Sequence, residues 1–231
     1  EKHPEHRLAV FAANLLLDGY NLTGDMDALE KQVDVFLKIY TPQRDPEFYA
    51  LLTKLKQQSS FKKCQGIERT KEWVRAATCF KQYAANYPQS EFVDKAYYNA
   101  ALNYEREKML EQSIEMKLKI VNDVPQSDLV PKALYQVAGN LHALAIYSQA
   151  AKIYEVYAEK FPKEENARDA LKNAAVFRQG LGDYDQALLD ATAYMKLIGS
   201  KPEEAAEVFF TMGLTYEKQG EWDEVIGDFN D

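Results

Sequence analysis

The sequence repeats itself with a period of 37 residues. The segment NYPQSEFVDKAYYNAALNYEREK, which begins at Asn86, is echoed by DVPQSDLVPKALYQVAGNLHALA, which begins at Asp123. The prolines of these segments and a third proline stand 37 residues apart, at Pro88, Pro125 and Pro162. A fixed period of this size indicates an array of small structural repeats, because each repeat can bury its apolar face only against its neighbours.

Small and bulky residues recur in register with the prolines. Two small columns read Cys64, Ala101, Ala138, Ala175, Gly213 and Ala76, Ser113, Ala150, Ala187; the bulky column between them reads Trp73, Leu110, Tyr147, Tyr184, Trp222. Small residues on both members of a helix pair let two antiparallel helices approach closely. Because apolar residues recur at three- and four-residue steps without sustained alternation, the pattern predicts helix pairs and no sheet.

Glycine, proline and serine mark the ends of the expected helices. Gly24, Gly182 and Gly220 stand where a first helix must end in a left-handed residue. The repeated prolines end each second helix, since proline cannot continue it. Ser90 and Ser127 are placed to cap the helix that follows. We therefore expect about eleven or twelve helices joined by short connections.

One repeat is longer than the others. The matching bulky positions of the first two repeats, Met26 and Trp73, are 47 residues apart, ten more than the regular step. The tripeptide Asp45-Pro46-Glu47 offers a cap, a proline and an early acidic residue, which together form a strong helix start. The excess therefore predicts a first helix of the second repeat that is longer at its N-terminus by about three turns.

The segment FFTMGLTYEKQGEWDEVIGDF, residues 209–229, resembles the signature of the tetratricopeptide repeat (TPR) family, and so does LKNAAVFRQGLGDYDQALLDATAYM. The resemblance covers practically the whole chain, and its long-turn form is similar to repeats of bacterial cell-envelope TPR proteins. It implies an all-α, right-handed superhelix of about six stacked helix pairs, with a short N-terminal extension at residues 1–7. The expected repeats are 8–47, 48–93, 94–130, 131–167, 168–205 and a truncated 206–231. Since the sequence starts at Glu1 and stops within a helical pattern, we expect a segment of a longer protein.

The net charge argues against a nucleic-acid partner, whereas the uneven distribution of charge is compatible with a charged protein partner. With 28 Lys and Arg against 36 Asp and Glu, the net charge is −8, which gives no positive field for nucleic acid. Residues 54–75 hold seven basic and two acidic residues, whereas 200–231 hold two basic and nine acidic ones. These stretches are either solvated helix faces or a charged partner surface, which includes end-to-end self-association. The longest nearly apolar run, 8–17, is too short to span a bilayer.

The sequence offers no catalytic or metal-binding constellation. Cys64 and Cys79 have no metal-ligand spacing, and although a bridge between them is conceivable, we expect two free buried thiols. His142 is a lone helical histidine, for which packing or surface is the expected role. Acidic residues are dispersed, and nothing assembles a nucleophile, a base and an orienting group. We therefore expect no enzyme activity, no cofactor and no metal in this chain.

The TPR resemblance implies that the first helix of each repeat lines a concave groove that binds peptides. On that geometry an aromatic column reads Phe61, Tyr98, Tyr135 and Phe210, interrupted by Lys172, beside a polar column of Lys62, Asn99, Gln136 and Asn173. The candidate peptide-binding residues are Lys95, Tyr98, Asn99, Lys132, Tyr135, Gln136, Lys172 and Asn173. Tyrosine beside an amide side chain offers apolar contact and hydrogen bonds to a peptide backbone. The alternative is that the tyrosines only fill gaps between helices.

We therefore predict a non-catalytic scaffold or adaptor that binds a protein segment on its concave face. The alternative is a substrate-recognition or regulatory arm of an enzyme whose catalytic domain lies elsewhere. The repeat type alone favours a periplasmic or cell-envelope location over the cytoplasm. Because a fold does not fix a function, the sequence does not identify the partner, the pathway or the oligomeric state.

Overall fold

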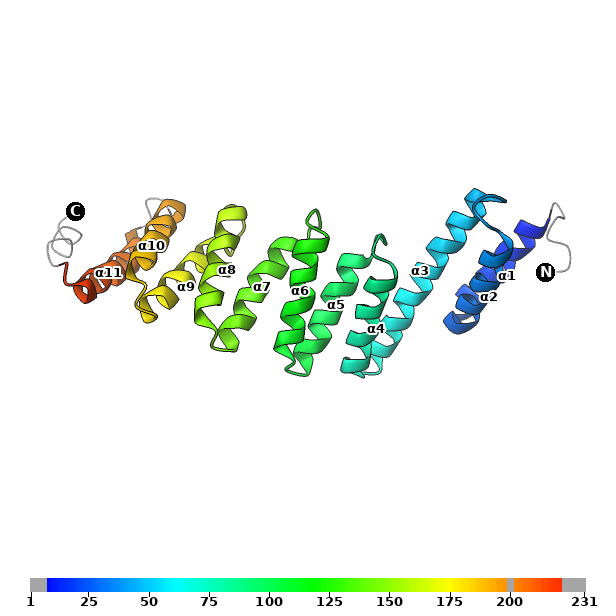
Figure 1. Cartoon of the computed structure of the whole chain (residues 1–231), viewed down its shortest axis with the longest axis horizontal. Coiled ribbons are helices and arrows are strands. Elements are labelled where there is room, and N and C mark those ends of the chain that lie inside the picture. Colours follow the sequence, from blue (N-terminus) through cyan, green and yellow to red (C-terminus); the bar gives the residue numbers. More distant parts are fainter. Residues whose placement is uncertain (1–7, 199–201, 222–231) are drawn as a thin grey trace. The chain divides into compact units, whose positions relative to one another are not determined.

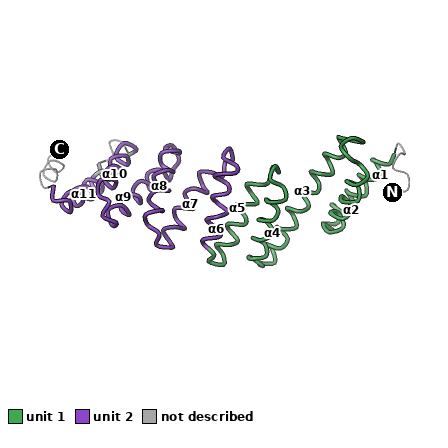
Figure 2. Tube along the Cα trace, viewed as in Figure 1, with its two compact units in different colours: residues 1–109 green, residues 110–231 purple. Residues whose placement is uncertain are grey.

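The computed structural model describes residues 8–198 and 202–221, and these residues form eleven helices and no strand (Figure 1). They fall into two compact units, Glu1–Met109 and Leu110–Asp231 (Figure 2). The first unit contains α1 (Ala9–Thr23), α2 (Met26–Ile39), α3 (Pro46–Arg69), α4 (Trp73–Asn86) and α5 (Val93–Arg106). The second contains α6 (Leu110–Asp123), α7 (Val130–Ala143), α8 (Tyr147–Lys160), α9 (Ala167–Gly180), α10 (Tyr184–Ile198) and α11 (Pro202–Gln219).

Within each unit every helix packs against the next one along the chain. The bulky column marks the first residue of each second helix, since α4, α6, α8 and α10 begin at its members. Members of the small columns are buried completely, among them Ala76, Ala101, Ala138 and Ala150. The structure thus confirms the prediction of an all-α array of stacked helix pairs. Trp222, the last bulky residue, and the expected extension 1–7 lie outside the described residues.

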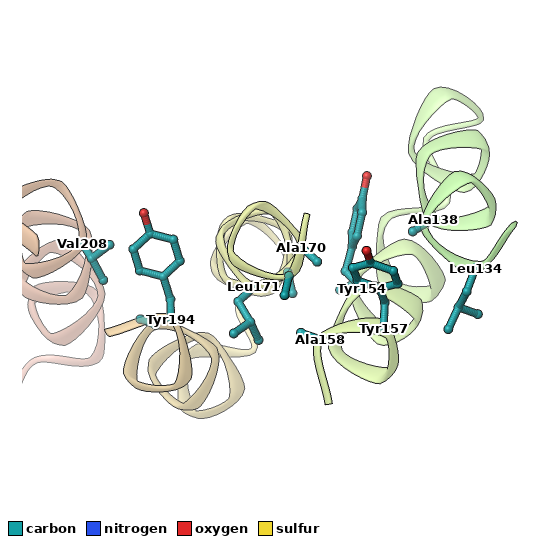
Figure 3. Packing of buried hydrophobic residues seen from close by; sticks show 13 residues of the cluster. Leu134, Ala138, Tyr154, Tyr157, Ala158, Ala170, Leu171, Tyr194 and Val208 are labelled. Carbon is teal, nitrogen blue, oxygen red and sulfur yellow. The ribbon is translucent and has the colours of Figure 1, made fainter. Parts of the chain in front are cut away.

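The second unit shows how small residues and tyrosines share the core. Ala138 of α7 and Ala170 of α9 are both buried completely. Tyr154 and Tyr157 extend from α8 into the space beside α7 and α9 (Figure 3). Each ring fills the volume that the neighbouring alanines leave, which keeps the helices close without leaving voids.

The predicted glycine turns are confirmed, with φ of 73° at Gly24, 78° at Gly182 and 81° at Gly220. The other repeats adopt the same left-handed conformation without glycine. The residues there are Lys71, Lys108 and Ala145, with φ of 63°, 61° and 57°. A side chain in this conformation crowds its own backbone, so these three turns are strained where the glycine turns are not.

We expect Ala145→Gly to raise the free energy of unfolding by about 1 kcal/mol, because glycine removes the left-handed penalty. Ala143→Gly is the matched control, since Ala143 is the last residue of α7. A glycine there should lower the free energy of unfolding, because glycine is less favourable than alanine in a helical conformation. Urea midpoints of the two variants decide the matter. Two variants that are equally destabilised would show that the turn at residue 145 is not strained.

Ser90 caps the turn before α5 rather than the helix itself. Its hydroxyl accepts from the backbone N–H of Phe92 at 3.2 Å and hydrogen-bonds the Tyr83 hydroxyl at 2.7 Å. The helix begins at Val93 and its N-cap residue is Phe92, so the prediction that Ser90 caps the helix was wrong. Ser127 makes the same bond to the N–H of Leu129 at 3.1 Å. The physical reason is that each serine closes the tight turn that follows the proline, and the helix starts one residue after that turn.

The longer helix of the second repeat is confirmed. α3 has 24 residues against 14 in α5, and it starts at Pro46. The Asp45 carboxylate accepts a hydrogen bond of 3.0 Å from the N–H of Phe48, as an N-cap does. The added turns carry Phe48 against Tyr40, with ring centroids 4.8 Å apart. The extension therefore continues the apolar contact between α2 and α3.

Beside their shared apolar core, which includes Val33 and Leu52, α2 and α3 also meet through charged groups. Lys56 pairs with Asp34, and Lys63 pairs with Asp27 at 2.9 Å. The two lysines are seven residues apart and so are the two aspartates, so antiparallel helices bring them opposite each other in order. Glu30 lies between them and accepts from Lys63 at 3.5 Å. The charges of these two lysines of the basic stretch are therefore paired within the unit.

One face of α1 is apolar and uncovered. Phe11, Leu15 and Leu22 are 62 %, 57 % and 87 % exposed. Leu16 is also exposed, although its equivalent in α5, Ala100, is buried completely. In this unit α5 packs on α4, the second helix of the preceding repeat. On α1, the surface equivalent to the one that α5 packs on α4 is exposed among the described residues.

Cys64 and Cys79 form a disulfide, so the expectation of two free thiols was wrong. Cys64 lies on α3 and Cys79 on α4, with their Cα atoms 5.4 Å apart. The two residues stand at nearly equal distances on either side of the turn, and the antiparallel helices therefore place them opposite each other. Cys64 is itself a member of a small column, where the helices come closest.

Reduction of this disulfide should lower the free energy of unfolding by about 3 kcal/mol, because it frees a loop of 15 residues in the unfolded chain. The measurement is a urea titration with and without reductant. A Cys64→Ser/Cys79→Ser variant controls for effects of the reductant. Its urea midpoint should be the same with and without reductant, because it has no disulfide to reduce. An unchanged midpoint of the unsubstituted protein on complete reduction would contradict the expectation.

None of the helices in the described parts of the chain is long and apolar enough to cross a membrane.

Candidate functional site

The candidate peptide-binding residues are divided between the two units. Lys95, Tyr98 and Asn99 lie on α5 in the first unit. In the second unit, Lys132, Tyr135 and Gln136 lie on α7, and Lys172 and Asn173 lie on α9. All eight are exposed or half-exposed. The eight residues therefore form two separate sets, one in each unit.

Tyr135 is the aromatic residue around which the second set gathers. Its ring packs against Tyr154 and Tyr157 of α8, at centroid distances of 5.5 and 5.2 Å. The hydroxyl of Tyr154 is hydrogen-bonded to the side chain of Asn173. Tyr154 therefore links Tyr135 of α7 to Asn173 of α9. The sequence columns of the first helices do not contain this link, because Tyr154 lies on a second helix.

The same aromatic triad occurs in the first unit, two repeats earlier. Phe61 packs against Phe80 and Tyr83, with both centroid distances 5.3 Å. These residues are the equivalents of Tyr135, Tyr154 and Tyr157 at an offset of 74 residues. Phe61 is only 8 % exposed, so this member of the predicted aromatic column belongs to the core. For Phe61 the gap-filling alternative is correct.

A single position accounts for the difference between Phe61 and Tyr135. Phe92 stacks on Phe61, with ring centroids 5.3 Å apart and planes 30° apart. The equivalent of Phe92 beside Tyr135 is Asn166, which has no ring. Tyr135 consequently packs on two tyrosines but lacks the third ring, and it remains half-exposed.

Burial perturbs the ionisation of this tyrosine cluster. It raises the pKa of Tyr154 to about 12, with Tyr135 adding to the rise and the hydrogen bond to Asn173 opposing it. Burial also raises the pKa of Tyr135, and the Asp169 carboxylate adds to that rise. The pKa of Tyr157 rises for the same first reason, against the hydrogen bond from Asn166. All three hydroxyls are therefore neutral hydrogen-bonding groups at physiological pH.

The first unit's set is less enclosed. The Lys95 ammonium lies over the Phe92 ring, 5.6 Å from its centroid, in a cation–π arrangement. The backbone carbonyl of Asn99 accepts from the side chain of Asn103 at 2.8 Å. Tyr98 is half-exposed. Phe210, the last member of the aromatic column, is 57 % exposed on α11.

His142 packs against aromatic rings, as expected for a lone helical histidine. Its ring lies 4.7 Å from Phe177 and 5.9 Å from Tyr147, centroid to centroid. Across residues 8–198 and 202–221, the side chains that the structure describes include no group of three or more His, Cys, Asp or Glu that could hold a metal ion.

No protein-family model matches the sequence, and no curated protein matches it significantly. Solved structures do match. MamA AMB-1 is 16 % identical, with a TM-score of 0.51 over 76 % of this chain and 89 % of that one. A mutant of MamA is 17 % identical, with a TM-score of 0.51 over 75 % of this chain and 88 % of that one. YrrB, a TPR protein with an unusual peptide-binding site, is 17 % identical, with a TM-score of 0.48 over 74 % of this chain and 82 % of that one.

The 37-residue helix pairs and the similarity to MamA agree on the fold. The chain is a TPR-like repeat protein. At identities below one fifth, the similarity shows the TPR-like fold alone.

The cluster makes stability depend on pH in alkaline solution. Tyr154 ionises near 10 when unfolded and near 12 when folded, so its contribution is complete below pH 10. Between pH 10 and pH 12 the unfolded chain gives up this proton and the folded chain keeps it, so the free energy of unfolding falls. Tyr154→Phe removes that ionisation, and we expect its stability to fall less steeply over this range. Urea midpoints that fall in parallel for the two proteins would contradict the assignment.

Proposed function

We propose that this TPR-like protein is a non-catalytic scaffold that holds a segment of a partner protein on the exposed first-helix surface of its second unit. The observation that carries the proposal is the open face of Tyr135. Its triad is built like the one around Phe61, but Asn166 stands where the covering Phe92 would be.

The side chains around Tyr135 suit an extended polypeptide. A rigid ring gives apolar contact area at a low entropy cost, and aromatic residues dominate many interfaces. Gln136 and Asn173 lie on α7 and α9 as half-exposed amides; since the Oε1 atom of Gln136 is buried, Gln136 would meet a peptide backbone as a donor. These features support a partner that lays an apolar side chain against Tyr135.

Lys132 and Lys172 support a partner segment with acidic residues. They lie on the same two helices as Gln136 and Asn173, in a chain whose net charge is −8. Charges at the rim of an interface act mainly on the rate of encounter and on salt sensitivity. The two lysines would therefore steer the partner, while the aromatic contact holds it. Lys95, Tyr98 and Asn99 would offer a second contact region on the first unit.

We further propose a cell-envelope location, where the protein would act in an assembly. The Cys64–Cys79 disulfide supports this, because disulfides persist in oxidising compartments and are rare in reducing ones. The long-turn repeat type supports the same location.

The decisive variant is Asn166→Phe. It should place a ring over Tyr135 as Phe92 lies over Phe61, and so cover the open face, while it removes the hydrogen bond from Asn166 to Tyr157. Asn166 makes no side-chain cap to α9, so its replacement removes no cap. We expect binding of a partner captured by the immobilised protein to weaken by about 2 kcal/mol, roughly thirtyfold in Kd.

Asn166→Ala is the matched control, because it removes the same amide without adding a ring. It should bind the partner like the unsubstituted protein, and both variants should keep the helical circular dichroism spectrum. If Asn166→Phe is folded and binds with unchanged affinity, the face of Tyr135 is not the docking surface.

A further inference from the structure

Two charged residues of the second unit stand in columns that hold no charged residue in the second to fourth repeats. There the column of Arg178 reads Ile67, Tyr104 and Leu141, and the column of Asp190 reads Cys79, Met116 and Ile153; in the first repeat the position of Asp190 is taken by Gln32. Asp190 is nevertheless buried, with only 3 % of its surface exposed. Because buried carboxylates are rare unless they have partners, this departure from the repeat calls for a physical account.

The partners of Arg178 are clear. Its guanidinium donates to both carboxylate oxygens of Glu155, at 2.7 and 3.1 Å, and to Asp183 at 2.9 Å. This bidentate arrangement fixes Glu155 of α8 against α9 and neutralises its charge.

Asp190 is satisfied on one side only. Its Oδ1 accepts a hydrogen bond of 3.0 Å from Gln186, one turn earlier on α10. Its Oδ2 is buried and accepts no hydrogen bond from the described residues, and the protonated carboxyl lies within hydrogen-bonding reach of Glu155. A buried acceptor without a donor is unfavourable, which points to a donor that comes from outside the chain.

A pocket of about 430 Å³ opens at this carboxylate, between α8 and α10. Leu171 of α9 and Ala158 of α8 contribute to its walls; both side chains are labelled in Figure 3. The lining residues are Glu155, Ala158, Glu159, Leu171, Gln186, Leu189, Asp190, Ala193, Lys196 and Leu197. The walls are thus largely aliphatic, with carboxyl groups from two helices converging in one place.

We propose that this pocket binds a primary ammonium or guanidinium group carried on an aliphatic stem, of the kind that a lysine or arginine side chain of a partner protein presents. The stem would lie against Leu171, Leu189 and Leu197. The head group would donate to Oδ2 of Asp190. A cation is favoured over a neutral donor because, with Glu155 neutralised by Arg178, the carboxyl groups of Asp190 and Glu159 line the pocket against the single ammonium of Lys196.

The ionisation of Asp190 agrees with this role. Burial raises the pKa of its carboxyl to about 7, and the neighbouring Glu155 adds to the rise, while Gln186 and Arg178 oppose it. Glu159 and Lys196 complete the charged groups at the pocket. A cation binds the ionised carboxylate, so its affinity should increase as pH rises through 7 and level off above it.

The pocket is lined mainly by second helices and shares no residue with the proposed scaffold surface on the first helices, so each can be tested without the other. The probes are N-acetyl-lysine methylamide and its uncharged isostere N-acetyl-norleucine methylamide, added to the isotope-labelled protein. We expect the lysine probe to cause saturable methyl shifts at Leu189 and Leu197, which the isostere does not cause. Putrescine serves as a free amine, and the tighter of the two cationic probes indicates whether a polypeptide or a small amine is the natural source.

Asp190→Asn should weaken the lysine probe at least tenfold, because the carboxylate is replaced by an amide of the same shape. Glu165→Gln is the control, since it removes one negative charge from the exposed turn after α8. It should leave binding unchanged. Equal shifts with the charged and uncharged probes, no saturable shift with either cation, or unchanged binding by Asp190→Asn would each overturn the proposal.

Discussion

The close approach of paired helices at small residues is the constraint on which the rest of this structure depends. Ala76, Ala101, Ala138 and Ala150 are buried completely, and their lack of bulk fixes both the spacing and the register of each pair. Once the register is set, every other column has a fixed neighbour. This is why the triad around Phe61 and the triad around Tyr135 have nearly the same ring distances although they lie two repeats apart.

Repetition also supplies an internal reference for the unusual positions. Asn166 differs from its equivalent Phe92 and leaves a tyrosine open, and Asp190 differs from its equivalent Ile153 and places a carboxylate in an apolar column. Neither departure improves packing, since one removes a ring and the other buries a charge. In an array whose stability is a sum of similar repeats, such positions are where selection for something other than stability is most readily seen.

Local features of the fold could be predicted from sequence, and features that depend on neighbouring helices could not. The start of α3 at Pro46 and the turn at Gly182 follow from the chemistry of a few adjacent residues. The left-handed Ala145 carries no such signal, because the geometry of the helix pair imposes its conformation. Likewise, the burial of Phe61 depends on Phe92, 31 residues away, and the link between Tyr135 and Asn173 depends on α8.

The contact between α2 and α3 has one aromatic end and one charged end. Tyr40 and Phe48 meet edge to face at the first, whereas Lys63 and Asp27 form a solvent-exposed pair at the second. Salt screens the exposed charges but hardly weakens the contact between the rings. At high ionic strength the charged end of this contact should therefore loosen while the aromatic end holds.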